Sequence, residues 1–107
     1  IADLGGLEVA LDACIAARPT GLVGQGTPDE LIDGFTPVQR FFLSYAQVWK
    51  TAMRDEKARL MIMVDTHSPA KFRTIGPLSN MSRFFEAYQV PLAGRMFRPL
   101  EERVVIW

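Results

Sequence analysis

The segment from Thr36 to Met53 constrains the fold most strongly, because it combines a clear helix start with apolar side chains on nearly every side. Thr36, Pro37 and Gln39 form the start signal: an N-cap hydroxyl, a proline at the first helical position and a reciprocal capping partner at the third. The helix expected after this signal carries these apolar residues: Phe41, Phe42, Leu43, Tyr45, Ala46, Val48, Trp49, Ala52 and Met53. A helix that is apolar nearly all round is typical of a protein interior, so the pattern predicts that this chain lacks a covering partner.

Apolar residues spaced three and four apart predict further helices. One covers residues 1–17, and another begins at a Ser79 or Asn80 cap and carries a regular apolar stripe. The stripe consists of Met81, Phe84, Phe85 and Tyr88. Residues 55–64 favour a third helix, although the apolar run 60–64 is also compatible with a strand.

Glycine and proline predict loops between these helices. Residues 19–35 are expected to form a loop with a helical turn at 27–30, and residues 66–78 a second loop, because a Ser-Pro and a Gly-Pro pair interrupt it. Another helical turn is expected at 99–102. The prediction is a mainly α fold with long ordered loops and little or no sheet.

Composition limits the possible classes of function. The chain has 107 residues, enough for one domain at most, and 12 basic residues balance 12 acidic ones, which argues against nucleic-acid binding. It contains no apolar run of the ~20 residues that a membrane-spanning helix needs. Cys14 is the only cysteine, so an intrachain disulfide is excluded, and its apolar neighbours predict a buried side chain. The chain begins inside a predicted helix, from which we expect a fragment.

Five strings together resemble a known family, and they occur in that family's order with closely matching spacing. They are IADLGGLEVA (1–10), FTPVQRFFLSYAQVW (35–49), DTHSPAKFR (65–73), GPLSNMSRFFEAY (76–88) and ERVVIW (102–107). The family is that of the neprilysin-like zinc metallopeptidases, which includes endothelin-converting enzyme and bacterial oligopeptidases. The resemblance implies that residues 1–107 are the C-terminal helical part of a thermolysin-like zincin catalytic domain.

The same resemblance implies that zinc is the cofactor and that its ligands lie upstream. In the family, two histidines of an HExxH helix and the glutamate that begins the string E-N-I-A-D hold the metal. Ile1, Ala2 and Asp3 match the last three letters of that string, so the glutamate would lie two positions before Ile1. No metal ligand is therefore expected within this chain.

Asp3 and His67 match family residues with catalytic roles. Asp3 matches the aspartate that orients a zinc-ligating histidine by accepting its second ring N–H. His67, the only histidine, matches the donor to the oxyanion that forms when water attacks the peptide carbonyl. Without the resemblance, the residues favour plainer interpretations: an acid in the first turn of a helix and a solvated imidazole in a loop.

Four further residues are candidates for the same site. Asp65 is placed to hold the ring of His67, or is simply the last residue of the preceding helix. Arg73 matches the arginine that contacts the substrate backbone on the prime side of the scissile bond, and is otherwise a surface cation. Val48 and Trp49 match residues of the apolar prime-side pocket, and either could equally belong to the core.

The resemblance implies that the chain is part of a zinc metalloendopeptidase that hydrolyses short peptides with bulky apolar side chains on the prime side. The isolated chain is predicted to be inactive, and its partners are expected to be peptide substrates and the missing upstream part of the domain. Its apolar helix predicts self-association. The alternative is a non-catalytic helical interaction module that only resembles the peptidase.

The resemblance also bears on location and origin. It implies an extracytoplasmic location, whether periplasmic, secreted or in the cell envelope. Animal members carry a cysteine close to the C-terminal tryptophan. This chain has none there, which favours a bacterial member.

Overall fold

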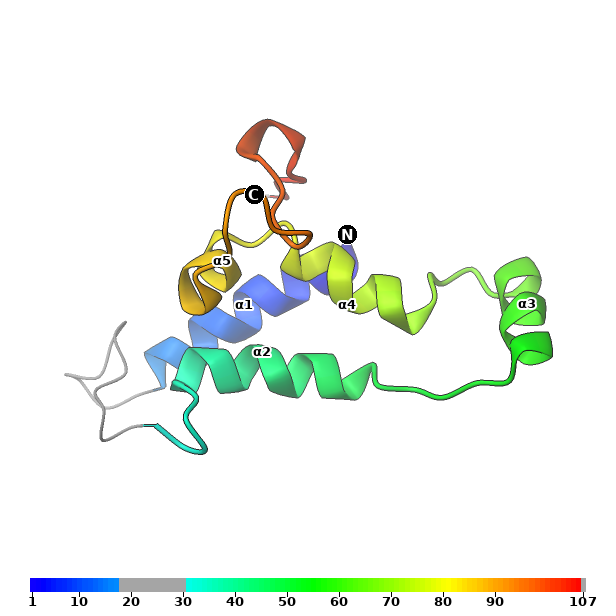
Figure 1. Ribbon diagram of the computed structural model, residues 1–107, viewed down its shortest axis with the longest axis horizontal. Helices are drawn as coiled ribbons and strands as arrows, with labels where there is room; N and C mark the ends of the chain where they lie inside the picture. Colours follow the sequence, from blue (N-terminus) through cyan, green and yellow to red (C-terminus); the bar gives the residue numbers. More distant parts are fainter. Residues whose placement is uncertain (18–30, 107) are drawn as a thin grey trace.

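The computed structural model describes residues 1–17 and 31–106, and this part of the chain is built from helices joined by extended segments (Figure 1). In chain order the helical elements are α1 (Ala2–Ala16), α2 (Pro37–Val48), α3 (Asp55–Val64), α4 (Ala70–Leu78), α5 (Ser82–Tyr88) and the 3-10 turn η2 (Leu100–Glu102). Strand pairing within the described ranges is limited to one bridge between Ile32 and Phe35. The predicted mainly α fold is confirmed, and so is the turn at 99–102. The turn predicted at 27–30 lies outside the described residues.

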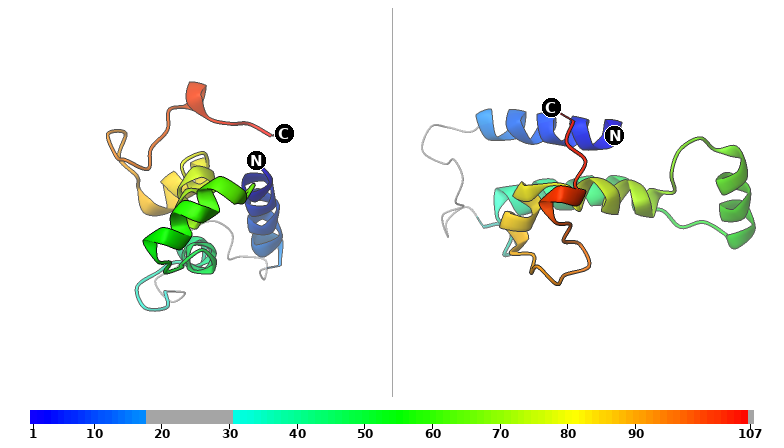
Figure 2. Two further views of the ribbon diagram at one scale, coloured as in Figure 1. Left: turned by 90° about the vertical axis from the view of Figure 1, so that its right-hand side faces the viewer. Right: turned by 90° about the horizontal axis from the view of Figure 1, so that it is seen from above.

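The core lies where α1, α2, α4 and α5 meet. α1 packs against α4, and α2 packs against α5 (Figure 2). The buried apolar cluster consists of Leu4, Leu7, Leu11, Phe42, Leu78 and Met81. Its three leucines lie on one face of α1 at the spacing of helical turns, so burial of this face fixes α1 against the rest of the molecule.

α2 begins with the capping box that the sequence predicts. The backbone N–H of Gln39 donates to Oγ1 of Thr36 at 3.2 Å, and the backbone N–H of Thr36 donates to Oε1 of Gln39 at 2.9 Å. The Gln39 side chain also reaches α5, because its Nε2 donates to the carbonyl of Ala87 at 2.8 Å. The hydroxyl of Tyr88 returns the contact by donating to the carbonyl of Gln39 at 2.9 Å. The start of α2 is thereby fixed to α5.

The end of α2 was predicted wrongly. The apolar pattern extends the helix to Met53, whereas α2 ends at Val48. Its last turn tightens, since the N–H groups of Trp49 and Lys50 donate to carbonyls three residues earlier. Residues 50–54 are exposed, so no packing supports a further helical turn.

α3 has the predicted bounds, and the alternative of a strand over residues 60–64 is wrong. No side chain of α3 is buried. The helix projects from the rest of the molecule on two extended connections, which contributes to overall dimensions of 49 × 32 × 26 Å (Figures 1 and 2). The large apolar side chains that it exposes are Leu60, Ile62, Met63 and Val64.

Residues 70–78 form a helix where a loop was predicted. The Ser-Pro pair does not interrupt this helix, because Pro69 is its N-cap and has extended backbone angles. Pro77 lies in the last turn, where proline removes only one hydrogen bond of the helix. Side chains beyond the helix end satisfy a terminal carbonyl: Ser79 Oγ and Asn80 Nδ2 both donate to the carbonyl of Gly76.

The predicted cap of α5 is also wrong. α5 starts after Met81, which makes no side-chain cap bond, and not after Ser79 or Asn80. Both polar side chains are used elsewhere. They bond to the end of α4, and Oδ1 of Asn80 also accepts the backbone N–H of Val104 at 2.8 Å. Asn80 therefore joins α4 to the C-terminal segment.

Cys14 is exposed, contrary to the prediction from its apolar neighbours. The buried face of α1 continues from Leu11 to Ile15, which packs against the core, and this places Cys14 beside that face. None of the helices in the described part of the chain is both long and apolar enough to cross a bilayer.

Candidate functional site

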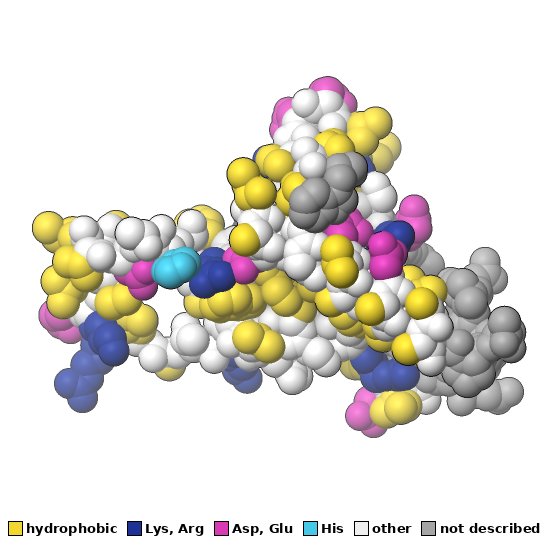
Figure 3. Space-filling model, turned by 180° about the vertical axis from the view of Figure 1, so that it is seen from behind, with side chains coloured by type: hydrophobic (Ala, Val, Ile, Leu, Met, Phe, Trp, Pro, Cys, Tyr) yellow, Lys and Arg dark blue, Asp and Glu magenta, His cyan; other side chains and the backbone are white. Residues whose placement is uncertain are grey.

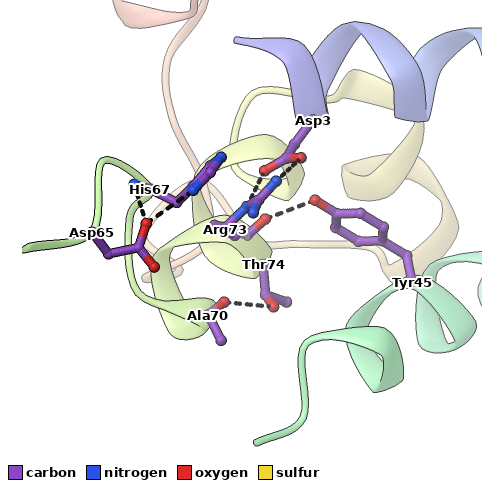
Figure 4. A network of polar contacts seen from close by, with 7 residues as sticks. All are labelled: Asp3, Tyr45, Asp65, His67, Ala70, Arg73 and Thr74. Carbon is purple, nitrogen blue, oxygen red and sulfur yellow. Dashed lines mark hydrogen bonds and ion pairs between the residues drawn. The ribbon is translucent and has the colours of Figure 1, made fainter. Parts of the chain in front are cut away.

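Four of the predicted site residues lie together where the start of α1, α2, and the segment from residue 65 into α4 meet (Figure 4). They are Asp3, Asp65, His67 and Arg73. α1 contributes Asp3 from its first turn, and α4 contributes Arg73 from its first turn. Asp65 and His67 lie in the connection that leads into α4. Residues up to 70 positions apart in the sequence thus share one site.

Asp3 and Arg73 form a two-pronged ion pair. Nε of Arg73 donates to Oδ2 of Asp3 at 2.7 Å, and Nη2 donates to Oδ1 at 2.6 Å. Their side chains are 24% and 25% exposed. The hydrogen bonds from Arg73 hold the pKa of Asp3 below its ordinary value, and Asp3 in turn raises the pKa of Arg73. Both groups stay charged at neutral pH, and the pair fixes the plane of the guanidinium.

Arg73 is also held by α2. Its guanidinium carbon lies 3.9 Å from the ring centroid of Trp49, in the geometry of a cation–π contact. The hydroxyl of Tyr45 donates to the backbone carbonyl of Arg73 at 2.7 Å. Burial is the main cause that raises the pKa of Tyr45, so the hydroxyl keeps its proton and remains a donor.

Asp65 holds His67 in a defined orientation. Oδ1 of Asp65 accepts the backbone N–H of His67 at 2.8 Å and lies 2.9 Å from Nδ1 of its ring. The backbone hydrogen bond is the largest cause of the lowered pKa of Asp65. A carboxylate can only accept, so Nδ1 carries a proton in this contact and Nε2 is turned away from Asp65. The imidazole is 67% exposed and lies at the surface beside cationic and acidic side chains (Figure 3).

A hollow of about 540 Å³ lies between the end of α2, α3 and the start of α4. Its apolar wall is made of Trp49, Met53, Ala58, Met61 and Ile62. Asp65, His67 and Arg73 border the same space. The hollow therefore has the composition of a ligand site, an apolar surface with a few polar groups at its edge.

The structure brings together five of the six predicted site residues. Asp3, Asp65, His67, Arg73 and Trp49 lie at or next to the hollow. Val48 lies outside its lining and is 71% exposed. The sequence analysis missed Tyr45, which was assigned only to the apolar surface of its helix. A proline within a helix leaves one carbonyl without its usual N–H donor. This signal could have pointed to a donor such as Tyr45 only if residues 70–78 had been predicted as a helix.

The same residues determine whether the described part of the chain can hold zinc. Within the described ranges, no three histidine, cysteine, aspartate or glutamate side chains lie together as a metal site. Both oxygens of Asp3 bond to Arg73, and Asp65 bonds to His67. The side chains present here do not by themselves fit a zinc ion.

The fold of the chain is similar to part of a zinc metalloprotease of known structure. The chain is similar to ZMP1 from Mycobacterium tuberculosis, described as a zinc metalloprotease, with 39% identity and a TM-score of 0.84. The match covers 98% of this chain and 15% of that one.

The chain belongs to peptidase family M13, whose model matches residues 1–104. It is 43% identical over 99 residues to an endothelin-converting enzyme homolog of Locusta migratoria. This match covers 90% of this chain and 13% of the locust protein. A neutral endopeptidase of Lactococcus lactis is 29% identical over the full chain, which spans 14% of its length. The family resemblance seen in the sequence is confirmed, and the chain spans about a seventh of these relatives.

Proposed function

We propose that this chain is the C-terminal part of the catalytic domain of a zinc metallopeptidase, with the zinc ligands in polypeptide outside residues 1–107. The observation that carries the proposal is the meeting of two orientated pairs, Asp3–Arg73 and Asp65–His67, at one apolar hollow. Membership of family M13 and the likeness to the zinc metalloprotease ZMP1 support zinc as the cofactor. When bound, zinc polarises a peptide carbonyl and lowers the pKa of a water molecule.

In this proposal His67 stabilises the negative charge that develops on the substrate carbonyl oxygen. Asp65 occupies Nδ1, which leaves Nε2 for the substrate. Since both ring nitrogens then donate, the ring acts as an imidazolium. A donor directed at developing charge contributes about 3–4 kcal/mol to catalysis.

Arg73 and Asp3 are assigned to substrate binding and orientation. A guanidinium has five N–H donors, and Asp3 takes two of them. The remaining donors suit a substrate backbone carbonyl. Asp3 keeps lone pairs for the N–H of a zinc-ligating histidine from the rest of the domain, as the family match implies.

The hollow is assigned to an apolar side chain on the prime side of the scissile bond. Trp49 and the methionine and isoleucine side chains of its wall supply an apolar surface of suitable size for a short peptide. Val48 is included in this pocket on the family match alone. Its exposure would be covered by the remainder of the domain.

The first test is the activity of the 107-residue chain itself. We expect no stoichiometric zinc and no peptide hydrolysis from it, because the metal ligands lie elsewhere. Metal analysis and a fluorogenic peptide assay would decide this. Stoichiometric zinc together with peptide turnover would overturn the proposal that the zinc ligands lie outside residues 1–107.

The second test uses the full-length polypeptide that contains this chain. We expect His67→Ala to lower kcat by about 10²–10³-fold, the loss typical for an oxyanion donor, with zinc content unchanged. Arg73→Ala should raise KM instead. Arg83→Ala, which removes an exposed ion pair with Asp12, serves as the matched control. Unchanged kinetics in all three variants would favour the alternative of a non-catalytic helical interaction module.

We also propose an extracytoplasmic location, which rests on family membership and on relatives such as mouse membrane metallo-endopeptidase-like 1. Bacterial origin stays a prediction, because an insect relative and a bacterial structure are similarly close in identity.

A further inference from the structure

The helix that carries Arg73 has a defect in its backbone hydrogen bonding. In an α-helix, the N–H of each residue donates to the carbonyl four residues earlier. Residue 77 is proline, which has no N–H, so the carbonyl of Arg73 lacks the usual donor four residues later in its own helix. Part-buried backbone carbonyls that lack a donor are costly, and most find another partner.

The partner is a side chain from another helix. The hydroxyl of Tyr45, in α2, donates to the carbonyl of Arg73 at 2.7 Å across a separation of 28 residues (Figure 4). Tyr45 also lies one turn before Trp49 on α2, and their rings meet edge to face with centroids 6.5 Å apart. One face of α2 therefore contacts both the backbone and the guanidinium of Arg73.

We propose that the Tyr45 hydroxyl replaces the helix donor that Pro77 lacks, and that it thereby acts as a positioning residue for Arg73. This inference rests on the proposed role of Arg73 in substrate binding. Three contacts hold the arginine: Tyr45 at its carbonyl, Trp49 at the face of its guanidinium and Asp3 at one edge. Of these three contacts, only the one from Tyr45 is made to the main chain of Arg73.

The test is a cycle of variants in the full-length polypeptide, assayed for peptide hydrolysis. Tyr45→Phe removes the hydroxyl and keeps the ring, and we expect KM to rise about 2- to 10-fold, the equivalent of one net hydrogen bond, with a smaller change in kcat. Pro77→Ala restores an N–H four residues after Arg73, so the double variant Tyr45→Phe/Pro77→Ala should return KM close to the wild-type value.

Tyr88→Phe is the matched control. It also removes a part-buried tyrosine hydroxyl that donates to a backbone carbonyl, that of Gln39, at 2.9 Å. We expect Tyr88→Phe to lower the thermal unfolding midpoint about as much as Tyr45→Phe does, and to leave KM unchanged. A purely structural role of Tyr45 would make the two variants indistinguishable in KM, which would overturn the inference.

Two further results separate this inference from the proposed function. If Arg73→Ala raises KM and Tyr45→Phe does not, the positioning role is overturned and the role of Arg73 stands. If Arg73→Ala leaves KM unchanged, the substrate role of Arg73 is lost, and with it the positioning role.

The thermal unfolding midpoints still show whether the Tyr45 hydroxyl replaces the donor that Pro77 lacks. The shift caused by Tyr45→Phe must then be smaller in the Pro77→Ala background, and equal shifts in the two backgrounds would overturn the replacement.

Discussion

At the scale of single residues, the site is organised around the charge of Asp3. Its carboxylate joins the first turn of α1 to α4 through two short hydrogen bonds with Arg73. Acidic side chains are favoured in the first turn of a helix, and here the arginine adds a second favourable contact. The strength of the pair depends on the ionisation of one carboxyl group, so it depends on pH.

The pH dependence of this pair is predictable in sign. The folded-state pKa of Asp3 lies below its unfolded value near 3.8, so the unfolded chain binds a proton more readily. The stabilisation is complete above about pH 5 and is lost as pH falls through the lowered pKa. We expect Asp3→Asn to be less stable than wild type at pH 6, and the difference to shrink below about pH 4.

Unfolding by urea at several pH values measures this difference. Glu101→Gln, at an exposed position in η2, is the control and should show a much smaller change with pH. A constant difference between Asp3→Asn and wild type from pH 3 to 7 would contradict the ionic origin of the contact. In the full-length polypeptide, the proposed contact of Asp3 with a zinc-ligating histidine predicts that Asp3→Asn lowers activity or zinc affinity about 10–100-fold.

The sequence singled out residues that the structure brings together, but it did not predict the contact between Asp3 and Arg73. The resemblance assigned roles to Asp3 and Arg73 separately, one toward a histidine and one toward substrate. Their contact joins positions 70 residues apart, and no periodicity or local motif reports such a separation. Asp65 and His67 are two residues apart, and their contact was predicted because it is local.

Among the helices, α2 is the one that connects Arg73 of the site to α5. Its first turn is attached to α5, and its last turns carry Tyr45 and Trp49 toward Arg73. The start of α2 was predictable because the capping box is a local signal within four residues. Its end was not, because the tertiary contacts that decide how far the helix continues are absent from the apolar pattern.

The capping box allows its two functions to be separated by mutation. Thr36→Ala removes only the cap and should cost about 1 kcal/mol of unfolding free energy. Gln39→Glu keeps an oxygen for the Thr36 N–H but loses the Nε2 donor to the carbonyl of Ala87. We expect it to cost more than Thr36→Ala, because the carbonyl of Ala87 would face a carboxylate oxygen. Chemical denaturation measures both values. A Gln39→Glu variant as stable as the wild type would show that the bond to α5 contributes nothing.

α4 shows why a proline can mislead sequence interpretation. The pattern rule treats Gly-Pro as a loop signal, and in most helix interiors the lost bond and the steric clash support that rule. Here the proline lies in the last turn, and the carbonyl that loses its usual donor accepts the hydroxyl of Tyr45 from another helix. The compensation comes from a residue 28 positions away, so it cannot be recognised locally.

At the scale of the whole molecule, apolar surface is distributed unevenly. The cluster formed by α1, α2, α4 and α5 is packed, whereas α3 contributes no buried residue. An exposed group of large apolar side chains on one element is typical of a surface that another polypeptide covers. The radius of gyration of 15.8 Å exceeds the ~13 Å typical of a compact domain of this length, which agrees with the projection of α3.

We therefore expect the 107-residue chain to self-associate above micromolar concentration. The double variant Ile62→Lys/Met63→Lys should shift it toward monomer, because it places charge in the exposed apolar surface of α3. Ala10→Lys/Ala13→Lys adds the same charge at exposed positions of α1 and serves as the control. Light scattering over a concentration series measures the effect. A wild-type chain that stays monomeric, or equal effects of both variants, would contradict a role for α3.

The projection of α3 also has a consequence for local unfolding. Opening a helix that buries no side chain exposes little new apolar surface, so little free energy opposes it. In the isolated chain, the amides of α3 are expected to exchange with solvent through this local opening, well before those of α1 and α2. Ala58, Met61 and Ile62 of α3 form one wall of the hollow, and Asp65 and His67 lie on the segment that leads back from it. We therefore expect the dimensions of the hollow to change with any polypeptide surface that packs against α3 and orders this one helix.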